Sequence, residues 1–191
     1  IVEGPTFLAT IQCFRLYGAE LISAPIDGNG VKTDELEKLI AEHKPKFVYL
    51  IPTFGNPSGA MLGLERRKAV LEMAVKHNTL IVEDDPYGDL YFGDAPPPSL
   101  LNLSATVPGS RDLLVHCGSL SKVLSPGLRV GWMIAPAELL GKATMCKQFS
   151  DAHTSTFAQA TAAQYLKAGR MPGTLANVRK VYAERAQAMG D

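Results

Sequence analysis

Cysteine is scarce in this chain of 191 residues, which argues against a disulfide scaffold. The three cysteines, Cys13, Cys117 and Cys146, are an odd number and lie far apart. They predict buried free thiols in a reducing compartment. No cluster of cysteine or histidine has the spacing of metal ligands, so no metal site is expected. The four histidines are scattered and are expected to be surface or packing residues: His43, His77, His116 and His153.

Net charge and long apolar runs are also missing. Nineteen basic residues balance nineteen acidic ones, which removes any argument from bulk charge for a nucleic-acid or membrane surface. No apolar run approaches the roughly 20 residues of a membrane span, and the first residues do not have the pattern of a secretory signal. We therefore expect no nucleic-acid partner for this segment, no membrane association and a cytoplasmic location.

Apolar runs alternate with helical patterns along the chain. Strands are predicted at about residues 1–3, 20–26, 46–52, 79–83, 113–117 and 129–135. Helices are predicted at about residues 6–17, 33–43, 64–77, 138–150, 156–168 and 175–189. The prolines at 96–98 and the segment 102–109 predict an irregular excursion. The alternation predicts an α/β fold with three layers, αβα, and a mainly parallel sheet covered on both faces.

One lysine stands in an unusual setting. Lys122 follows two serines, Ser119 and Ser121, and Arg129 lies seven positions further on. Hydroxyls and a guanidinium are what a phosphate dianion needs, and an amine beside them can form a Schiff base with an aldehyde. Pyridoxal phosphate carries both groups. Taken alone, Ser-x-Ser-Lys is more often an ordinary strand end and loop, so the prediction depends on the longer pattern.

Polar side chains also follow other predicted strands. Asn56 comes after the strand at 46–52, and Asp84 and Asp85 come after the strand at 79–83. Ligands of open α/β sheets collect at the carboxyl ends of the strands. A carboxylate at a buried strand end is costly unless it meets a cation, and the protonated pyridine nitrogen of pyridoxal phosphate is such a cation. One pocket could therefore hold these groups together.

The combined motifs resemble one family. Ser119-x-Ser121-Lys122 followed by Pro126-Gly127-Leu128-Arg129-x-Gly131-Trp132 is similar to the cofactor-lysine signature of class I/II aminotransferases, the fold-type I enzymes that use pyridoxal 5'-phosphate (PLP). Asn56-Pro57-x-Gly59 and Asp84-x-x-Tyr87 resemble two further motifs of that family. The resemblance extends over nearly the whole chain.

The resemblance implies roles for the lysine stretch. Lys122 would carry the cofactor as a Schiff base and then take the α-proton of the amino acid as a general base. Ser119 and Arg129 would bind the phosphate, with Ser121 a weaker candidate for the same role. Trp132 would pack in the domain core.

It also implies how the ring of the cofactor is held. Asn56 and Tyr87 would share its phenolic oxygen, and Asp84 would hold its pyridine nitrogen protonated. The spacing to the tyrosine selects Asp84 over Asp85, which would be a structural neighbour. Phe7 stands where many relatives place a tyrosine near the cofactor, and it could equally be a packing ring.

The implied function is that of a PLP-dependent aminotransferase, which moves an amino group between an L-amino acid and a 2-oxo acid by a ping-pong mechanism, in a homodimer. The resemblance is strongest to the branch that handles aminoadipate, aromatic or branched-chain substrates. Two alternatives stay open. One is a PLP-dependent lyase, and the other is the aminotransferase-like, ligand-sensing domain of a transcription regulator.

In this family a long helix leaves the large cofactor domain near the position of residues 169–173. The resemblance therefore implies a partial PLP-binding large domain at residues 1–170 and the beginning of the C-terminal small domain at residues 171–191. The family's upstream phosphate-binding loop and its arginine for the substrate carboxylate would lie outside this sequence. We expect the chain to be a piece of a longer polypeptide, incomplete at both ends and inactive alone.

Overall fold

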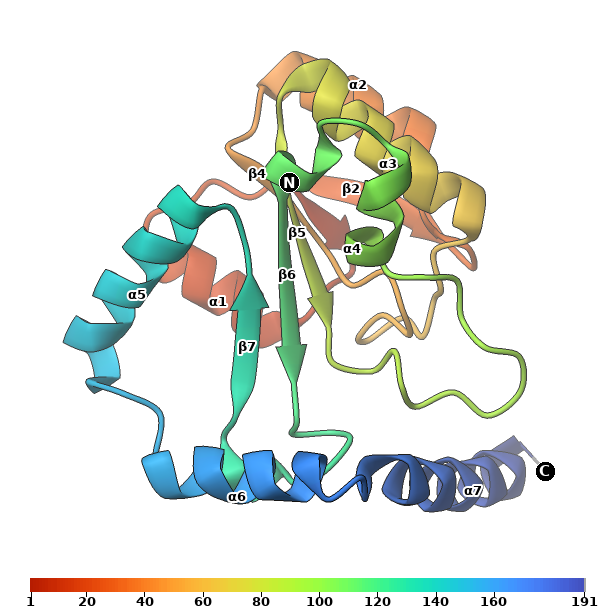
Figure 1. Cartoon of the computed structure of the whole chain (residues 1–191). Coiled ribbons are helices and arrows are strands. Elements are labelled where there is room, and N and C mark those ends of the chain that lie inside the picture. Colours follow the sequence, from red (N-terminus) through yellow and green to blue (C-terminus); the bar gives the residue numbers. More distant parts are fainter. Residues whose placement is uncertain (191) are drawn as a thin grey trace. The chain divides into compact units, whose positions relative to one another are not determined.

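A computed structural model describes residues 1–190, in which strands alternate with helices (Figure 1). The strands are β1 (Val2–Gly4), β2 (Ser23–Asp27), β3 (Gly30–Val31), β4 (Phe47–Leu50), β5 (Leu80–Asp85), β6 (Leu114–Ser119) and β7 (Gly131–Ile134). The helices are α1 (Leu8–Leu16), α2 (Thr33–His43), α3 (Leu64–His77), α4 (Leu100–Leu103), α5 (Ala137–Asp151), α6 (Thr156–Lys167) and α7 (Met171–Gly190). Short 3₁₀ turns lie at Ser104–Thr106, Ser110–Leu113 and Pro126–Leu128.

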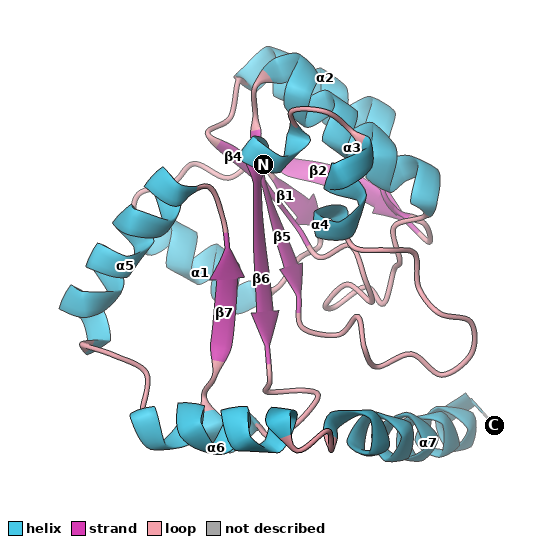
Figure 2. Cartoon of the chain, in the orientation of Figure 1, coloured by secondary structure: helices cyan, strands magenta, loops and turns pink. Residues whose placement is uncertain are grey.

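The seven strands form one mixed sheet in the order β3-β2-β1-β4-β5-β6-β7. β1 pairs in parallel with β2 and β4, and β4 pairs in parallel with β5 (Figure 2), whereas β3 is antiparallel to β2. The predicted α/β class is confirmed. Because β1, β4 and β5 are parallel, their carboxyl ends lie at one edge of the sheet, which is where ligands of such sheets collect.

The chain divides into two compact units. The first contains residues 1–85, 97–117 and 134–136, and the second contains residues 86–96, 118–133 and 137–191. Each unit has a hydrophobic core of its own.

One face of the strands in the first unit carries the larger core. Val48 and Leu50 of β4 and Ile81 of β5 are buried there against α2, α3 and α4. The buried residues from those helices are Leu36, Ile40, Val70, Leu71, Met73, Ala74, Leu100 and Leu103. The helix α3 has the predicted bounds, because its apolar residues recur at the spacing that places them on one side of a helix.

The opposite face of the same strands is also buried. Tyr49 of β4 and the adjacent Ile51 pack there with Val2 of β1, and Phe14 of α1 lies against them. Successive side chains of a strand point to opposite faces. A strand that is buried on both faces must therefore be apolar at nearly every position, as residues 47–51 are.

The second unit has a smaller core. Its buried members are Leu90, Leu120, Val123 and Ala162. Partly buried residues of α7 and of the loop between β6 and β7 pack against them: Leu124, Leu128, Val130, Met171, Leu175 and Val178. This core fixes the loop that contains Lys122 on both sides of the lysine.

The structure differs from the predicted elements in three places, the first of which is β3, a short strand that was not predicted. The segment 102–109 was predicted to be irregular, but it contains the end of α4 and a 3₁₀ turn. The carboxylate of Glu83 accepts hydrogen bonds from the first two amides of α4, those of Leu100 and Leu101, so this short helix is capped by a distant residue. The helix α7 begins at Met171, before the predicted position 175, because proline is tolerated in the first turn of a helix.

The prediction of buried thiols is wrong for two of the three cysteines. All three are free, but Cys13 and Cys146 are exposed and Cys117 is partly buried. Cys13 lies on α1 and Cys146 on α5, and neither helix has a buried residue. The apolar residues next to these cysteines in the sequence do not indicate that the two helix surfaces are exposed to solvent.

No helix within residues 1–190 has both the length and the apolar composition needed to cross a membrane. In the same range no three side chains of histidine, cysteine, aspartate or glutamate are grouped as metal ligands.

Candidate functional site

The site residues predicted from the sequence are divided between the two units. The first unit contains Phe7, Asn56 and Asp84, and the second contains Tyr87, Ser119, Ser121, Lys122 and Arg129.

Asp84 is a partly buried carboxylate near the end of β5. Its Oδ2 atom accepts a hydrogen bond from the hydroxyl of Tyr49 at 2.5 Å. Burial raises the pKa of Asp84, while the hydrogen bond from Tyr49 and the charge of His116 act in the opposite direction. Burial also raises the pKa of the nearby Cys117 thiol to about 11, with the charge of Asp84 adding to the effect. Asp84 is thus a fixed acceptor in a partly desolvated place, suited to a cation.

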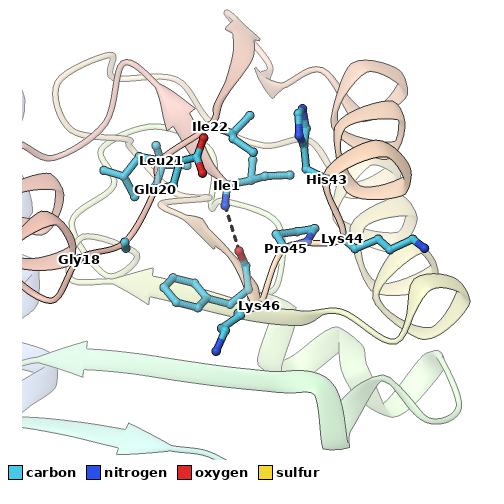
Figure 3. Close-up of a pocket in the computed structure, with 12 residues that line it drawn as sticks. Ile1, Gly18, Glu20, Leu21, Ile22, His43, Lys44, Pro45 and Lys46 are labelled. Atoms are coloured by element: carbon cyan, nitrogen blue, oxygen red, sulfur yellow. Dashed lines mark hydrogen bonds between the residues drawn. The ribbon is translucent and has the colours of Figure 1, made fainter.

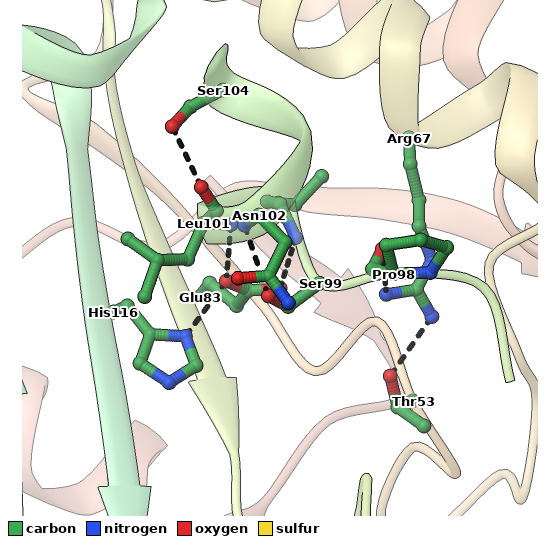
Figure 4. A network of polar contacts seen from close by, with 10 residues as sticks. Thr53, Arg67, Glu83, Pro98, Ser99, Leu101, Asn102, Ser104 and His116 are labelled. Carbon is green, nitrogen blue, oxygen red and sulfur yellow. Dashed lines mark hydrogen bonds and ion pairs between the residues drawn. The ribbon is translucent and has the colours of Figure 1, made fainter. Parts of the chain in front are cut away.

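The side chain of the preceding residue, Glu83, lies on the other face of the sheet. Its carboxylate is fully buried, caps α4 and lies 2.8 Å from Nδ1 of His116 (Figure 4). Burial disfavours the charged form of His116, but the hydrogen bond and charge of Glu83 outweigh it, so the pKa of His116 is raised. Because side chains alternate along a strand, Asp84 is separated from this structural pair. His116 is a packing residue, as the sequence indicated.

Asn56 lies half-buried in the loop that follows β4. The start of this loop is held by Arg67 of α3, whose guanidinium donates to the carbonyl of Pro52 at 2.9 Å and to Oγ1 of Thr53 at 2.8 Å. Figure 4 shows the Arg67 side chain reaching from α3 toward Thr53 and Pro98. The guanidinium is completely buried. Arg67 therefore sets where the Asn56 loop leaves the sheet.

Arg67 was not predicted from the sequence, although a signal was present. Its position falls on the helix face occupied by Val70, Leu71 and Ala74, which are all buried. An arginine in an apolar stripe is unusual, since a buried charge must be compensated by hydrogen bonds. Here the bonds go to the backbone of distant loops, which local patterns cannot reveal.

The end of β1 contributes a second buried acid. Glu3 accepts a hydrogen bond from the amide of Ile51 at 2.8 Å, and burial raises its pKa to about 7 against that bond. The hydroxyl of Thr6 is buried and has no hydrogen-bond partner within residues 1–190. Phe7 occupies the N-cap position of α1 and is 40% exposed, so it is not a core residue. No hydrogen bond between described residues joins Phe7 or Asn56 to Asp84.

In the second unit, Lys122 lies in the loop after β6. Its side chain is exposed between the buried Leu120 and Val123. The Lys122 ammonium has no hydrogen-bond or ion-pair partner in the described part of the chain. Oγ of Ser119 accepts a hydrogen bond from the amide of Ser121 at 3.0 Å, which turns the backbone just before the lysine. The backbone of the loop is therefore held by a hydrogen bond, while the Lys122 amine is exposed to solvent.

Arg129 ends the same loop. Its backbone has a φ of 54°, in the left-handed region that non-glycine residues seldom adopt and that is found at functional sites. Its guanidinium is exposed and donates to the carbonyl of Pro126 at 3.3 Å. The loop contributes two cations, Lys122 and Arg129, and neither forms an ion pair within residues 1–190.

Trp132 does not pack in the core as predicted, because 45% of it is exposed. Its ring lies against Gly118 of β6, where a Cβ atom would come within 2.3 Å of the ring. Only glycine fits at that position. The tryptophan thus supports the strand end just before Ser119.

Tyr87 is partly buried against the core of the second unit. Its carbonyl accepts a hydrogen bond from the amide of Leu90 at 2.8 Å. The segment that follows is fastened to α7 by Arg179, which donates to the carbonyl of Asp89 at 2.7 Å and stacks 3.8 Å from the ring centre of Tyr91. Tyr87 is therefore held within an anchored segment.

A pocket of about 400 Å³ lies elsewhere in the first unit, and Figure 3 shows its lining. It is formed by Ile1 and Val2 together with residues 18–22 and 43–47. These residues lie at the amino ends of the strands. None of the predicted site residues lines this pocket.

Comparison with known proteins places the chain in a family. Residues 1–189 match the model for aminotransferase class I and II, so the chain belongs to that family. It is 42% identical over 191 residues to the 2-aminoadipate transaminase of Thermus thermophilus, covering 99% of this chain and 47% of the relative. The crystal structure of LysN, an α-aminoadipate aminotransferase from Thermus thermophilus complexed with N-(5'-phosphopyridoxyl)-L-leucine, aligns with a TM-score of 0.93 and 40% identity, covering 98% of this chain and 48% of that one.

A relative of another kind is less similar. An uncharacterised HTH-type transcriptional regulator of Bacillus subtilis, YisV, is 31% identical over 188 residues, which cover 98% of this chain and 38% of the regulator. The chain spans about half the length of the curated transaminase that it matches.

Proposed function

We propose that the full-length protein is a PLP-dependent aminotransferase that moves an amino group between an L-amino acid and a 2-oxo acid. The observation that carries the proposal is the loop after β6, in which an exposed lysine without a protein partner among the described residues lies between a capped serine turn and Arg129. The similar transaminase acts, by its name, on 2-aminoadipate. We propose the same class of substrate, an amino acid with a second carboxylate or a bulky side chain.

The chemistry of the side chains fits PLP. A partly buried carboxylate, Asp84, suits a pyridinium nitrogen, and the amide of Asn56 and the phenol of Tyr87 suit the phenolic oxygen. The guanidinium of Arg129 and the hydroxyl of Ser119 suit a phosphate. When bound, the cofactor supplies an aldehyde for Schiff-base chemistry and a ring that accepts electrons from the α-carbon.

The residues of the chain are proposed to hold the cofactor and to transfer one proton. Lys122 would hold the cofactor through its amine, and its Nζ would act as the general base that accepts the α-proton of the amino acid. Asp84 keeps the pyridine nitrogen protonated. Arg129 and Ser119, with Ser121 as a weaker participant, fix the phosphate and thereby the ring. Phe7 is proposed as a ring beside the cofactor.

We propose that residues 1–170 belong to the large domain and that residues 171–191 begin a small domain. We also propose a homodimer and a cytoplasmic location. The chain alone should have little activity, because the family places a phosphate loop and a carboxylate arginine outside it.

The alternatives are not favoured by the comparisons. The relative with the higher identity is a transaminase, while the regulator is only 31% identical. A PLP-dependent lyase would use the same lysine and acid. Product analysis separates the three.

The test is an assay of the purified full-length protein with added PLP, L-2-aminoadipate and a 2-oxo acid acceptor. We expect absorbance from bound cofactor, formation of the second 2-oxo acid and ping-pong kinetics. The 191-residue chain, assayed in parallel, should give at least about thirtyfold less product, because the loss of one partner of a desolvated charge pair costs about 2–5 kcal/mol. Cofactor binding without turnover would favour a regulator, elimination products would favour a lyase, and no cofactor binding would contradict the proposal.

A further inference from the structure

The hydroxyl of Tyr49 lies between side chains from two other elements. It donates to Oδ2 of Asp84 on β5 at 2.5 Å and accepts from Oγ1 of Thr10 on α1 at 3.3 Å. Tyr49 is 3% exposed, and the ring of Phe14 meets its ring edge-on with ring centres 5.7 Å apart. Tyr49 is therefore a fixed donor rather than a mobile surface phenol.

The register of the sheet explains why these groups meet. Tyr49 of β4 is paired with Val82 of β5, and Asp84 is two residues further along the same strand. Side chains two apart share a face, so the long tyrosine ring reaches along that face to the carboxylate. Glu83 points to the other face, where it meets His116.

The direction of the hydrogen bonds is defined by the partners. A phenol has one proton to donate, and Thr10 supplies a second proton to its oxygen. Burial raises the pKa of Tyr49, and the charge of Asp84 raises it further. The phenol therefore stays protonated, and its proton is directed at Asp84. This occupies one carboxylate oxygen and leaves the other for a cation.

We propose that Tyr49 is a positioning residue for Asp84. Its hydroxyl, supported by Thr10, fixes one oxygen of the carboxylate and keeps the group ionised, so that the second oxygen is available to the pyridinium nitrogen of the cofactor. This inference rests on the proposed function, which assigns that nitrogen to Asp84.

Asp84 has other charged and titratable neighbours, which shape the test. His116 on β6 favours its ionised form, the Cys117 thiol on β6 is coupled to it, and Glu3 on β1 acts on Tyr49. Burial raises the pKa of Asp84, and the Tyr49 hydrogen bond and the charge of His116 lower it. If the tyrosine hydroxyl is removed, only the charge of His116 remains to oppose the effect of burial. Asp84 should then take up a proton at higher pH, and a neutral carboxyl group cannot pair with a pyridinium.

The variant Tyr49→Phe removes the donor and keeps the ring that packs against Phe14. The matched control is Tyr165→Phe in the second unit, which removes a tyrosine hydroxyl bonded to Thr174. Thermal melting confirms that each variant folds. If Tyr49→Phe fails to fold, Thr10→Val removes the support of the phenol and should shift every readout in the same direction by a smaller amount.

The first readout needs no cofactor. Aspartate labelled with ¹³C is incorporated into the full-length apoprotein, and the Asp84 carboxyl resonance, assigned with Asp84→Asn, is titrated by NMR. In Tyr49→Phe we expect its midpoint to rise by about one pH unit or more, the size typical for the loss of a direct hydrogen bond to a charged form. Tyr165→Phe should leave the midpoint unchanged.

The second readout uses the PLP-loaded protein. In Tyr49→Phe we expect kcat to fall roughly tenfold to a hundredfold, within the range that such electrostatic contacts contribute, with KM for the amino acid nearly unchanged. The acid limb of the kcat profile should move to higher pH. A purely structural role for Tyr49 would lower the melting temperature without moving this limb.

The outcomes separate the two proposals. Wild-type titration and kcat in Tyr49→Phe, together with inactive Asp84→Asn, would overturn the role of Tyr49 and leave the aminotransferase function standing. A wild-type protein that binds no PLP would overturn the function and this inference with it. The shifted midpoint together with the shifted acid limb supports the inference.

Discussion

The acidic side chains Glu3, Glu83 and Asp84 at the strand ends of the first unit have protein partners, whereas the cations of the loop after β6 face solvent. Asp84 is held by Tyr49, and Glu3 by the amide of Ile51. Lys122 and Arg129 are exposed and form no ion pair within residues 1–190. In the first region the fold holds the acidic side chains themselves. In the loop after β6 it holds only the backbone, and the charged ends of the side chains have no ion-pair partner among the described residues.

This contrast has a physical cause. A buried carboxylate must be hydrogen-bonded, since an unpaired one is strongly penalised. An exposed lysine or arginine is hydrated by water, so it needs no protein partner and remains available to bind an anionic or electrophilic ligand. Substitutions in the loop should therefore affect activity with little change in stability, and substitutions beneath the strand ends should affect stability as well.

The largest effect is expected for Lys122→Ala in the full-length protein. Transamination should fall by roughly a thousandfold or more, because a nucleophile and a general base are lost together. The melting temperature should stay close to that of the wild type, since the side chain is exposed. Lys142→Ala, on the exposed surface of α5, serves as the control in the same coupled assay. Activity within tenfold of wild type in Lys122→Ala would remove the lysine from the mechanism.

The second effect compares neighbouring acids of β5. Asp84→Ala should lower kcat by about a hundredfold or more, because an unprotonated pyridine nitrogen is a poor electron sink. Asp85→Ala should have a much smaller effect on kcat, since its charge acts on Arg67 and His116, on the other face of the sheet. Steady-state kinetics of both variants decide the matter. Equal losses would show that the choice of Asp84 is mistaken.

The third effect concerns stability beneath the Asn56 loop. Arg67→Met removes the donor to the carbonyls of Leu62 and Pro98 and one of the two donors to the carbonyl of Pro52, and should lower the free energy of unfolding by about 2–4 kcal/mol. Urea denaturation of the full-length protein measures this change. Lys68→Met is the control, because that lysine is exposed and pairs with Glu65 at the surface. Similar stability of the two variants would mean that the buried guanidinium contributes little.

The smallest effect is a pH dependence at Glu3. Its pKa is raised by burial from the ordinary 4.5 to about 7, so the folded state favours the protonated acid. The wild type should lose stability as the pH rises from about 4.5 through 7, where Glu3 ionises. Glu3→Gln stays neutral and its amide oxygen can still accept from Ile51, so relative to wild type it should be more stable at pH 8.5 than at pH 5 by about 2 kcal/mol.

Urea denaturation at the two pH values provides this measurement. Glu65→Gln, an exposed acid on α3, should show no such difference. An identical effect of Glu3→Gln at both pH values would show that Glu3 is ionised in the folded protein throughout the range.

Much of the fold could be predicted because it depends on local patterns. The continuous apolar run at 47–51 forms a strand buried on both faces, and the bounds of α3 agree with its apolar spacing. The excursion after β5 was mispredicted because α4 depends on Glu83, which is far from it in the sequence. Exposure of Cys13 and Cys146 was missed for the same reason, since burial depends on what covers a helix.

The site shows the same division. Motif spacing selected Asp84 rather than Asp85. In the structure Asp84 bonds to Tyr49, whereas the preceding acid, Glu83, bonds to His116. The groups that support the motifs were not predicted. Tyr49 belongs to the apolar run at residues 46–52, and nothing in the sequence around Arg67 indicates its distant partners. Their partners come from other elements, so only the fold reveals them.

The measurement that tests the central claim most directly is identification of the lysine that binds the cofactor. The full-length protein is loaded with PLP, reduced with borohydride and digested, and the labelled peptide is sequenced by mass spectrometry. We predict that the reduced cofactor is found on Lys122, between Ser121 and Val123. A label on Lys142, Lys147 or any other lysine, or no stable label at all, would contradict the account.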